Sequence, residues 1–265
     1  MLKPGRCLGF LLGATALAGS VAAVDGVREI HESCVAAGCF PGDTPGFPVQ
    51  VATSGSYRLT SNLHVTSADT TAIDVTAAAA TIDLNGVEIS GVTVCDFAGG
   101  TCVPGGSGNG VSASGAGVAD TVVRNGTVRG MGNIGVLVTG GGEVEHVQAI
   151  GNGSVGISVD PGAVRDCEVS LNGLYGISCG RCLASGNVVT LNLDVGMVAG
   201  SAGAHFTDNS VIQNRGFGIS GFGLAPAYGN NVVQENRGNN SLPQVAPGVG
   251  IEIATNVCGT DTICP

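Results

Sequence analysis

Residues Phe206–Asn214 read FTDNSVIQN, and the pair Gly218-Ile219 follows shortly after them. Apolar and polar residues alternate through this stretch with a period of 2, which is typical of a β-strand that buries one face. Units with the same pattern precede it at intervals of about 20 residues. The chain therefore contains an internal repeat, and a repeat of this length decides the fold before any local motif does.

Two columns of residues carry the repeat. The first is a glycine between two apolar residues, found at Gly135, Gly156, Gly176, Gly196, Gly218 and Gly250. The second is an asparagine with nearly the same spacing, found at Asn133, Asn152, Asn172, Asn192, Asn214 and Asn236. Such a unit is too short for a strand, a crossover helix and a second strand, so we expect each unit to form one turn of a coil. Asparagines at equivalent bends would hydrogen-bond to one another, which predicts a ladder along the coil.

The repeat predicts an all-β fold, a right-handed parallel β-helix of about eight or nine coils with a short N-terminal helical cap. Equivalent strands would stack about 4.8 Å apart. The cap is predicted because Val27, Ile30 and Cys34 share one helical face. The expected divisions are a signal peptide over 1–23, a cap segment over 24–46, the repeats over 47–257 and a disulfide-closed tail over 258–265. Loops are expected at 92–109, 221–229 and 237–248.

Composition narrows the range of functions. The 265 residues include 46 glycines and no tryptophan, only 11% of them are charged, and the net charge is -10. An acidic chain lacks the basic face that binds phosphate backbones, so nucleic acid is not an expected partner. The single lysine, Lys3, lies in the leader, which excludes lysine chemistry such as a Schiff base from the mature chain.

The N-terminus has the pattern of a secretory signal peptide. Lys3 and Arg6 precede an uncharged stretch over Cys7–Val24 that is rich in Leu, Ala and Gly. We expect cleavage after about Ala23. A membrane anchor is the alternative, but the stretch is short and weakly apolar for a span. The predicted location is secreted, periplasmic or extracellular, with no membrane span after cleavage.

Secretion favours disulfides. Three close pairs are expected to form bridges: Cys34 with Cys39, Cys95 with Cys102, and Cys258 with Cys264. Cys167, Cys179 and Cys182 remain, and their pairing is open. Cys179 and Cys182 form a CxxC on a bend between strands, without the helix N-terminus of a redox motif or the further ligands of a zinc site. A structural bridge or a buried thiol is the favoured interpretation, and no metal site is expected.

One column of the aligned units contains groups suited to acid–base chemistry; its members are Asn125, His146, Asp166, Gly186, Asp208 and Asn230. If this face is catalytic, His146 would be the base, Asp166 its partner one strand spacing away, and Asp208 a carboxylate two coils further on. Arg165 would clamp a substrate carboxylate. The simpler interpretation is that these polar residues begin a turn, and that Glu145 and Arg165 form an exposed cross-strand pair.

Three further side chains are candidates for substrate binding. Arg215 and Arg237 would stack on adjacent coils directly after ladder asparagines, where two positive charges suit an anionic sugar, although solvated turn residues explain them as well. Phe222 is the aromatic of the repeats that we expect outside, on a small insertion. Parity places the other aromatics inward; these are Tyr175, Phe206, Phe217 and Tyr228.

The units resemble the short repeats of the right-handed parallel β-helix proteins, the pectate-lyase-like superfamily, over roughly residues 47–257. The resemblance is carried by the unit Phe206–Asn214 and by the motif Thr81–Gly91, while residues 41–48 and 258–264 resemble secreted bacterial members of uncharacterised role. That superfamily includes polysaccharide lyases, hydrolases, epimerases, phage tailspikes, adhesins and a periplasmic copper-delivery protein. The resemblance therefore implies a fold and leaves the activity open.

Two functional hypotheses follow. The first is a secreted or envelope scaffold without an identifiable catalytic set, which contacts glycans or other surface partners and needs no cofactor. The alternative is a polysaccharide lyase, epimerase or hydrolase that acts on uronate-containing glycans through the column of His146, with calcium required if it is a lyase. The sequence leaves the oligomeric state open.

Overall fold

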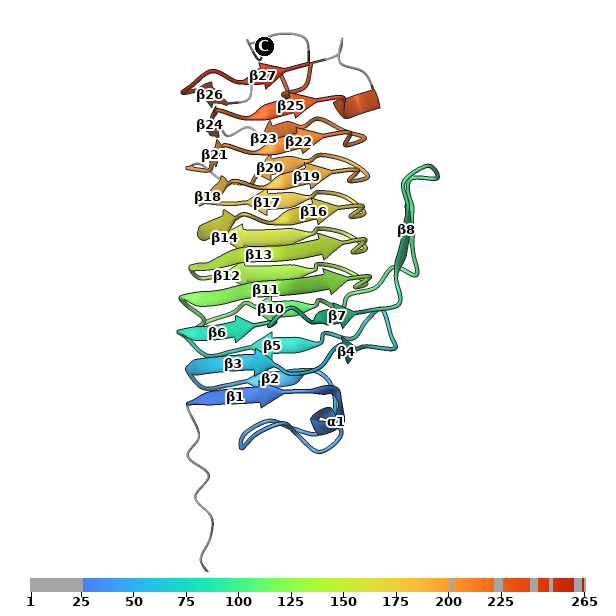
Figure 1. The fold of residues 1–265 in the computed structure, drawn as a ribbon, viewed down its shortest axis with the longest axis vertical. Helices are drawn as coiled ribbons and strands as arrows, with labels where there is room; N and C mark the ends of the chain where they lie inside the picture. Colours follow the sequence, from blue (N-terminus) through green and yellow to red (C-terminus); the bar gives the residue numbers. More distant parts are fainter. Residues whose placement is uncertain are drawn as a thin grey trace, which may run out of the picture.

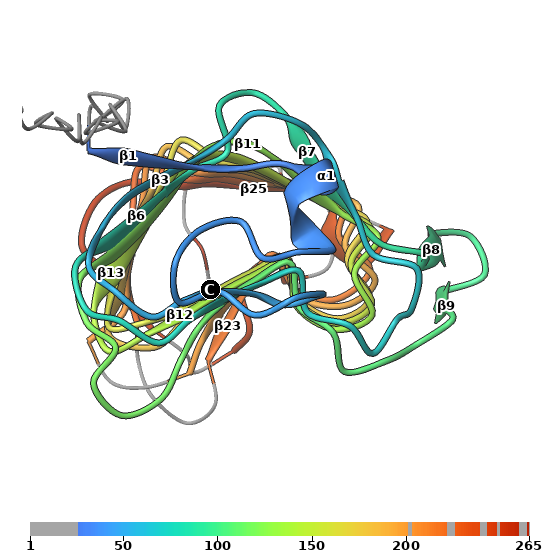
Figure 2. The ribbon, with the colours of Figure 1, turned by 90° about the horizontal axis from the view of Figure 1, so that it is seen from below.

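The computed structural model describes residues 26–200, 203–221, 226–238, 243–247, 250–259 and 264. The predicted signal peptide and Phe222 lie outside these residues. The described chain winds as an all-β parallel solenoid of about nine turns with almost no helix, which confirms the predicted fold class (Figure 1). Viewed along the axis, successive turns lie one behind another (Figure 2).

The strands of the described chain form three sheets. The 17-stranded sheet contains β1 (Val27–Ile30), β3 (Gly55–Leu59), β4 (Leu63–His64), β6 (Ala80–Asp83), β7 (Glu88–Ser90), β11 (Thr121–Arg129), β13 (Gly142–Ile150), β15 (Gly162–Arg165), β16 (Glu168–Ser170), β18 (Cys182–Ser185), β19 (Val188–Thr190), β21 (His205–Thr207), β22 (Ser210–Ile212), β24 (Ala227–Gly229), β25 (Val232–Gln234), β26 (Ile251–Glu252) and β27 (Val257–Cys258). The eight-stranded sheet contains β2 (Val49–Val51), β5 (Ile73–Val75), β10 (Val111–Ala113), β12 (Val136–Thr139), β14 (Ile157–Asp160), β17 (Ile177–Cys179), β20 (Met197–Ala199) and β23 (Ile219–Gly221). A separate hairpin is formed by β8 (Val94–Asp96) and β9 (Thr101–Val103), and the helical segments are α1 (Glu32–Val35) and the 3-10 turn η1 (Asn236–Gly238).

The helix at the N-terminal end of the coil is shorter than the predicted cap. α1 contains only Glu32–Val35 and buries Val35 (Figure 1). Val27 does not belong to a helix, because Val27–Ile30 forms strand β1 and pairs in parallel with β3. The alternation of period 2 therefore decides the orientation of Ile30, which is buried. The coil begins at Val27, ahead of the predicted start at residue 47.

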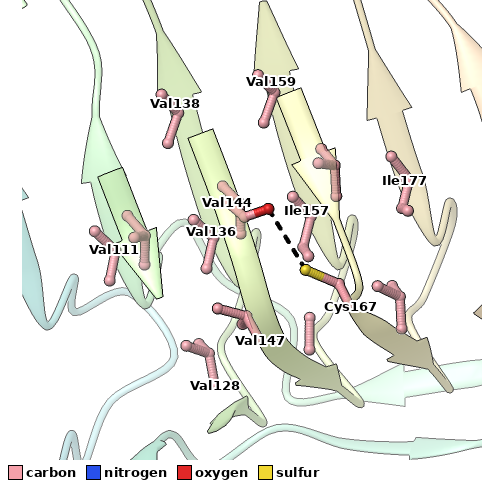
Figure 3. Packing of buried hydrophobic residues seen from close by; sticks show 14 of the residues in the cluster. Val111, Val128, Val136, Val138, Val144, Val147, Ile157, Val159, Cys167 and Ile177 are labelled. Carbon is pink, nitrogen blue, oxygen red and sulfur yellow. Dashed lines mark hydrogen bonds between the residues drawn. The ribbon is translucent and has the colours of Figure 1, made fainter. Parts of the chain in front are cut away.

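Apolar side chains from the two sheets meet inside the coil (Figure 3). One column of the eight-stranded sheet is completely buried; it contains Val49, Ile73, Val111, Val136, Ile157, Ile177, Met197 and Ile219. Opposite it, Val144 and Val164 belong to the 17-stranded sheet and are equally buried. Phe206 and Tyr228 continue that inward column, as parity predicts.

The predicted asparagine ladder runs from Asn152 to Asn236 along the bend that follows strands such as β16 and β19; we call this bend the second bend. Nδ2 of Asn172 donates to Oδ1 of Asn192 at 2.9 Å and to the carbonyl of Ala149 at 3.1 Å. Oδ1 of Asn172 accepts from the Nδ2 and the backbone N–H of Asn152, both at 3.0 Å. All four hydrogen-bonding positions of this buried amide are therefore used. The ladder contains Asn152, Asn172, Asn192, Asn214 and Asn236.

Asn133 is not a member of the ladder, and its assignment to that column is wrong. The position before Asn152 is Met131, whose backbone N–H donates to Oδ1 of Asn152 at 3.1 Å. Asn133 lies two residues further along the bend, where its carbonyl accepts from the N–H of Ser154. One turn therefore runs from Met131 to Asn152, and the shorter interval from Asn133 to Asn152 is not the length of a turn.

An unexpected second ladder runs along another bend of the coil, from Asn187 to Asn256. This first bend lies between strands such as β15 and β16. Nδ2 of Asn187 donates to Oδ1 of Asn209 at 2.9 Å, and the contact repeats from Asn209 to Asn231 and from Asn231 to Asn256. The regular interval of 22 residues from Asn187 to Asn231 is its signal in the sequence.

Each bend contains a residue with left-handed backbone directly before the inward asparagine. At the second bend these residues are Leu171, Leu191, Gln213 and Glu235, with φ between 54° and 59°. At the first bend, Gly186, Asp208 and Asn230 precede Asn187, Asn209 and Asn231. Left-handed backbone costs most residues about 1–2 kcal/mol. The hydrogen bonds of the asparagine that follows each of the four second-bend residues offset this conformational cost.

The glycine column makes room for the second-bend ladder. A Cβ atom on Gly156 would lie 2.6 Å from Nδ2 of Asn172, and one on Gly176 would lie 2.7 Å from Nδ2 of Asn192. The two columns of the repeat keep the same spacing because they touch. Gly250 is wrongly placed in this column, since Ile251 pairs with Ala227 in the 17-stranded sheet.

Four disulfides form among the described residues. They join Cys34 to Cys39, Cys95 to Cys102, Cys179 to Cys182 and Cys258 to Cys264. The three predicted close pairs are confirmed, and the CxxC is a bridge. Cys167 is a buried free thiol.

Cys167 occupies a ladder position at the first bend. Its N–H donates to Oδ1 of Asn187 at 3.0 Å, and its Sγ donates to the carbonyl of Val144 at 3.6 Å (Figure 3). Nδ2 of Asn187 makes the equivalent contact with the carbonyl of Val164. The thiol therefore replaces an asparagine amide. Burial raises the pKa of Cys167 to about 12, which keeps the thiol protonated and unreactive.

We expect Asn192→Ala to lower the free energy of unfolding by about 3 kcal/mol, because it leaves the buried N–H of Asn172 and carbonyl of Val169 without partners. Urea denaturation measures the change. Thr190→Ala, an outward change on β19, is the control. Equal losses from the two variants would contradict the structural importance of the ladder.

Cys167→Asn should fold with a stability within about 1 kcal/mol of the parent, because an amide fits the position that the thiol fills. Cys167→Val, which removes the polar group, should be less stable than Cys167→Asn by about 1–3 kcal/mol. Thermal melts of the two variants test this order. The reverse order would mean that Cys167 is not a ladder position.

Candidate functional site

The predicted catalytic column is aligned in the structure, at the first bend. Glu145, Arg165 and Ser185 pair in register on adjacent strands. The next residue of each strand therefore falls at the same position of the bend, and these residues include His146 and Asp166. All members of the column have left-handed backbone: Asn125, His146, Asp166, Gly186, Asp208 and Asn230, with φ between 51° and 70°.

The residue types in this column follow from that backbone. Asn, Asp and His are the non-glycine residues most enriched at positive φ. His146, Asp166 and Asp208 are exposed, and no hydrogen bond joins one to another within the described part of the chain. Their spacing along the axis suits acid–base chemistry, but the bend explains them without it. Their predicted catalytic roles stay predictions.

The charged residues beside this column pair differently from expectation. Arg124 lies between two carboxylates, 3.4 Å from Asp83 and 3.9 Å from Glu145. Arg165 forms its ion pair with Glu143 rather than with Glu145, although Glu145 is its register partner. The predicted Glu145–Arg165 pair is therefore wrong. A substrate carboxylate would have to compete with Glu143 for the Arg165 guanidinium.

The two candidate arginines of the second bend do lie on adjacent turns. The N–H of Arg215 donates to the carbonyl of Asn192, and the N–H of Arg237 donates to the carbonyl of Asn214. Among the described residues, no carboxylate oxygen lies within 4.0 Å of either guanidinium. Four other arginines do have such a partner: Arg124, Arg129, Arg165 and Arg181.

Two aromatic residues lie along the second bend: Phe217 is on the turn of Arg215, and Tyr175 is two turns before it. Phe217 and Tyr175 are half-buried and are not part of the core, so their predicted inward placement is wrong. Parity holds along a strand, but both residues lie in the bend before the column glycines, where the alternation is broken. The Arg237 guanidinium lies over the Phe217 ring, 4.6 Å from its centroid.

A carboxyl group completes this cluster. Burial raises the pKa of Asp194, and burial together with the charge of Asp194 raises the pKa of the Tyr175 hydroxyl. Asp194 lies against Gly216, where a Cβ atom would be 2.5 Å from its Oδ1. We call Tyr175, Asp194, Arg215, Phe217 and Arg237 the second-bend site. Groups with perturbed pKa values gather at functional sites more often than elsewhere.

The second-bend site offers cations and ring faces together. Guanidinium groups bind carboxylates and sulfates through paired N–H donors. Half-exposed aromatic rings give flat apolar surfaces next to them. No three His, Cys, Asp or Glu side chains of the described chain form a cluster that would hold a metal ion, and none of its helices is long and apolar enough to cross a membrane.

Similarity to known proteins assigns this chain to no family. No protein-family model matches the chain, and no curated protein matches it. A solved structure described as "Crystal structure of Agl-KA catalytic domain" is similar with a TM-score of 0.44 and 12% identity, over 77% of this chain and 46% of that chain. This chain thus spans less than half of that structure, and a similarity so low carries no argument about activity. Membership of the pectate-lyase-like superfamily stays a prediction.

We expect His146→Asn to leave the stability unchanged within about 0.5 kcal/mol, because asparagine accepts left-handed backbone. His146→Val should cost about 1–2 kcal/mol for the same reason. Chemical denaturation of both variants provides the measurement. If valine were tolerated as well as asparagine, the backbone would not be the reason for this column.

Proposed function

We propose that this protein is a non-catalytic β-solenoid scaffold that binds anionic glycans at its second-bend site. The coil supplies a rigid support, on which equivalent residues recur at every turn. Four disulfides fit an oxidising compartment outside the cytoplasm. Extracellular polysaccharides that carry uronate or sulfate groups are ligands with the complementary charge.

The observation that carries the proposal is the pair Arg215 and Arg237. The positive charges of the two arginines lie on adjacent turns and repel each other. The chain has a net charge of -10, so it contains enough carboxylates to neutralise them. The four ion-paired arginines lie beside acidic residues of neighbouring turns, whereas no carboxylate oxygen of the described residues lies within 4.0 Å of the guanidinium of Arg215 or Arg237. A bound polyanion would supply the missing negative charge.

The neighbouring side chains suit a sugar in particular. The Arg237 guanidinium already covers one face of Phe217, so the rest of that half-buried ring and the ring of Tyr175 are the apolar surface left for a pyranose ring, a contact that a small inorganic anion would not make. Asp194 is the one carboxyl group of the site. Because burial raises its pKa, it takes up a proton at a higher pH than an ordinary carboxyl does, and the protonated group does not repel an anion.

We expect the protein to be retained on immobilised polygalacturonate and not on a neutral glucan, with binding that weakens as salt increases. Arg215→Ala and Arg237→Ala should each weaken binding about tenfold, as the loss of one charge-assisted hydrogen bond would. Calorimetry or biolayer interferometry gives the affinities.

Arg58→Ala is the matched control, because Arg58 is also exposed and has no ion pair in the described chain. It should bind like the parent. Equal losses in all three variants would mean that net charge, and not the second-bend site, holds the glycan. If the same mixtures gained ultraviolet absorbance or reducing ends, and His146→Ala abolished that change, the protein would be an enzyme and the scaffold proposal would be wrong.

A further inference from the structure

A hairpin leaves the coil between β7 and β10 and extends along its side (Figure 1). Its strands β8 and β9 pair antiparallel, and the Cys95–Cys102 disulfide joins them. We call residues 93–104 the arm. Its base is fixed, because the N–H of Thr93 donates to the carbonyl of Gly130 at 2.8 Å and its hydroxyl donates to the carbonyl of Pro104 at 2.7 Å.

The arm follows the second bend from turn to turn. The sulfur atoms of Cys95 and Cys102 lie 3.6 and 3.9 Å from the carbonyl oxygen of Asn152. On the following turn, a Cβ atom on Gly173 would lie 3.0 Å from Sγ of Cys102. The disulfide therefore rests on two consecutive turns, and Figure 2 shows the arm outside this bend.

The tip of the arm reaches Arg215, 118 residues further along the chain. The Nη1 atom of Arg215 donates to the carbonyl of Phe97 at 3.4 Å. A Cβ atom on Gly100 would lie only 1.7 Å from the same nitrogen. Only a residue without a side chain allows this approach. Asp96 in the same tip is engaged within the turn, where its Oδ1 accepts from the N–H of Ala98.

We infer that the disulfide-closed arm is a positioning element of the second-bend site, which holds the Arg215 guanidinium ready for an anionic glycan. The inference rests on the proposed function. A guanidinium has five N–H donors, so the carbonyl of Phe97 occupies one and leaves others for a ligand. A long side chain that is already ordered loses less conformational entropy when it binds.

Gly100→Ala tests the contact at a single atom, because the new methyl group would displace the Arg215 guanidinium. Gly86→Ala is the matched control: Gly86 also has positive φ, 76° against 70°, but a Cβ there meets nothing within 4 Å. Cys95→Ser with Cys102→Ser frees the whole arm. Each protein is studied for its affinity for polygalacturonate and, without ligand, for the rate at which phenylglyoxal labels Arg215.

Gly100→Ala and the double serine variant should label Arg215 at least about threefold faster and bind polygalacturonate about three- to tenfold more weakly. Gly86→Ala should match the parent in both measurements. Unchanged labelling would overturn the inference, since the arm would then not hold Arg215. Unchanged or tighter binding despite faster labelling would also overturn it, because the arm would then have no effect on glycan binding or would block Arg215 from the glycan.

The two proposals fail in different ways. If the parent protein does not bind polygalacturonate, or if Arg215→Ala binds as well as the parent, the proposed function is wrong and the positioning role falls with it. If binding depends on Arg215 but is the same with and without a closed arm, only the positioning role is wrong. Mass spectrometry of the labelled peptide assigns the modification to Arg215.

Discussion

The turns from Asn152 onward have bends that the sheet hydrogen bonds do not reach, and buried amides supply the missing partners there. A side chain at such a bend has to accept from one turn and donate to another, and at the second bend it also has to fit against the glycine column. Asparagine meets all three conditions, and at one position the thiol of Cys167 does so in part. Within the turns that they join, the two ladders add to the register that the sheets impose. Arg215 and Arg237 directly follow ladder asparagines, so the contact between Asn214 and Asn236 fixes their spacing.

The fold could be predicted because the constraint repeats. Any single strand is short and ambiguous, but a column of asparagines at a constant interval has few explanations. The exceptions are informative. Asn133 was indistinguishable from a ladder residue by spacing alone, since only the hydrogen bond from Met131 to Asn152 shows where the turn begins. The second ladder is harder to recognise because Cys167, and not an asparagine, occupies the position before Asn187.

The candidate site could be predicted only in part. Arg215 and Arg237 were recognisable because they follow ladder asparagines directly. Phe217 and Tyr175 were not, because a parity argument needs continuous strand and these residues lie where the strand has ended. The contact of the arm with Arg215 joins segments 118 residues apart and leaves no periodic signal. A sequence repeat therefore predicts the coil that carries a site more readily than it predicts the contacts within the site.

Each ladder also has a direction. The Nδ2 of one asparagine always donates to the Oδ1 of the asparagine in the following turn, so the amide dipoles point the same way and reinforce one another. In a chain that emerges from the ribosome, the asparagine of the latest completed turn has an Nδ2–H without an acceptor. The asparagine Oδ1 of the next turn supplies that acceptor. Growth can thus proceed by templating from the N-terminal end, until Gln244 accepts from Asn236 and ends the series.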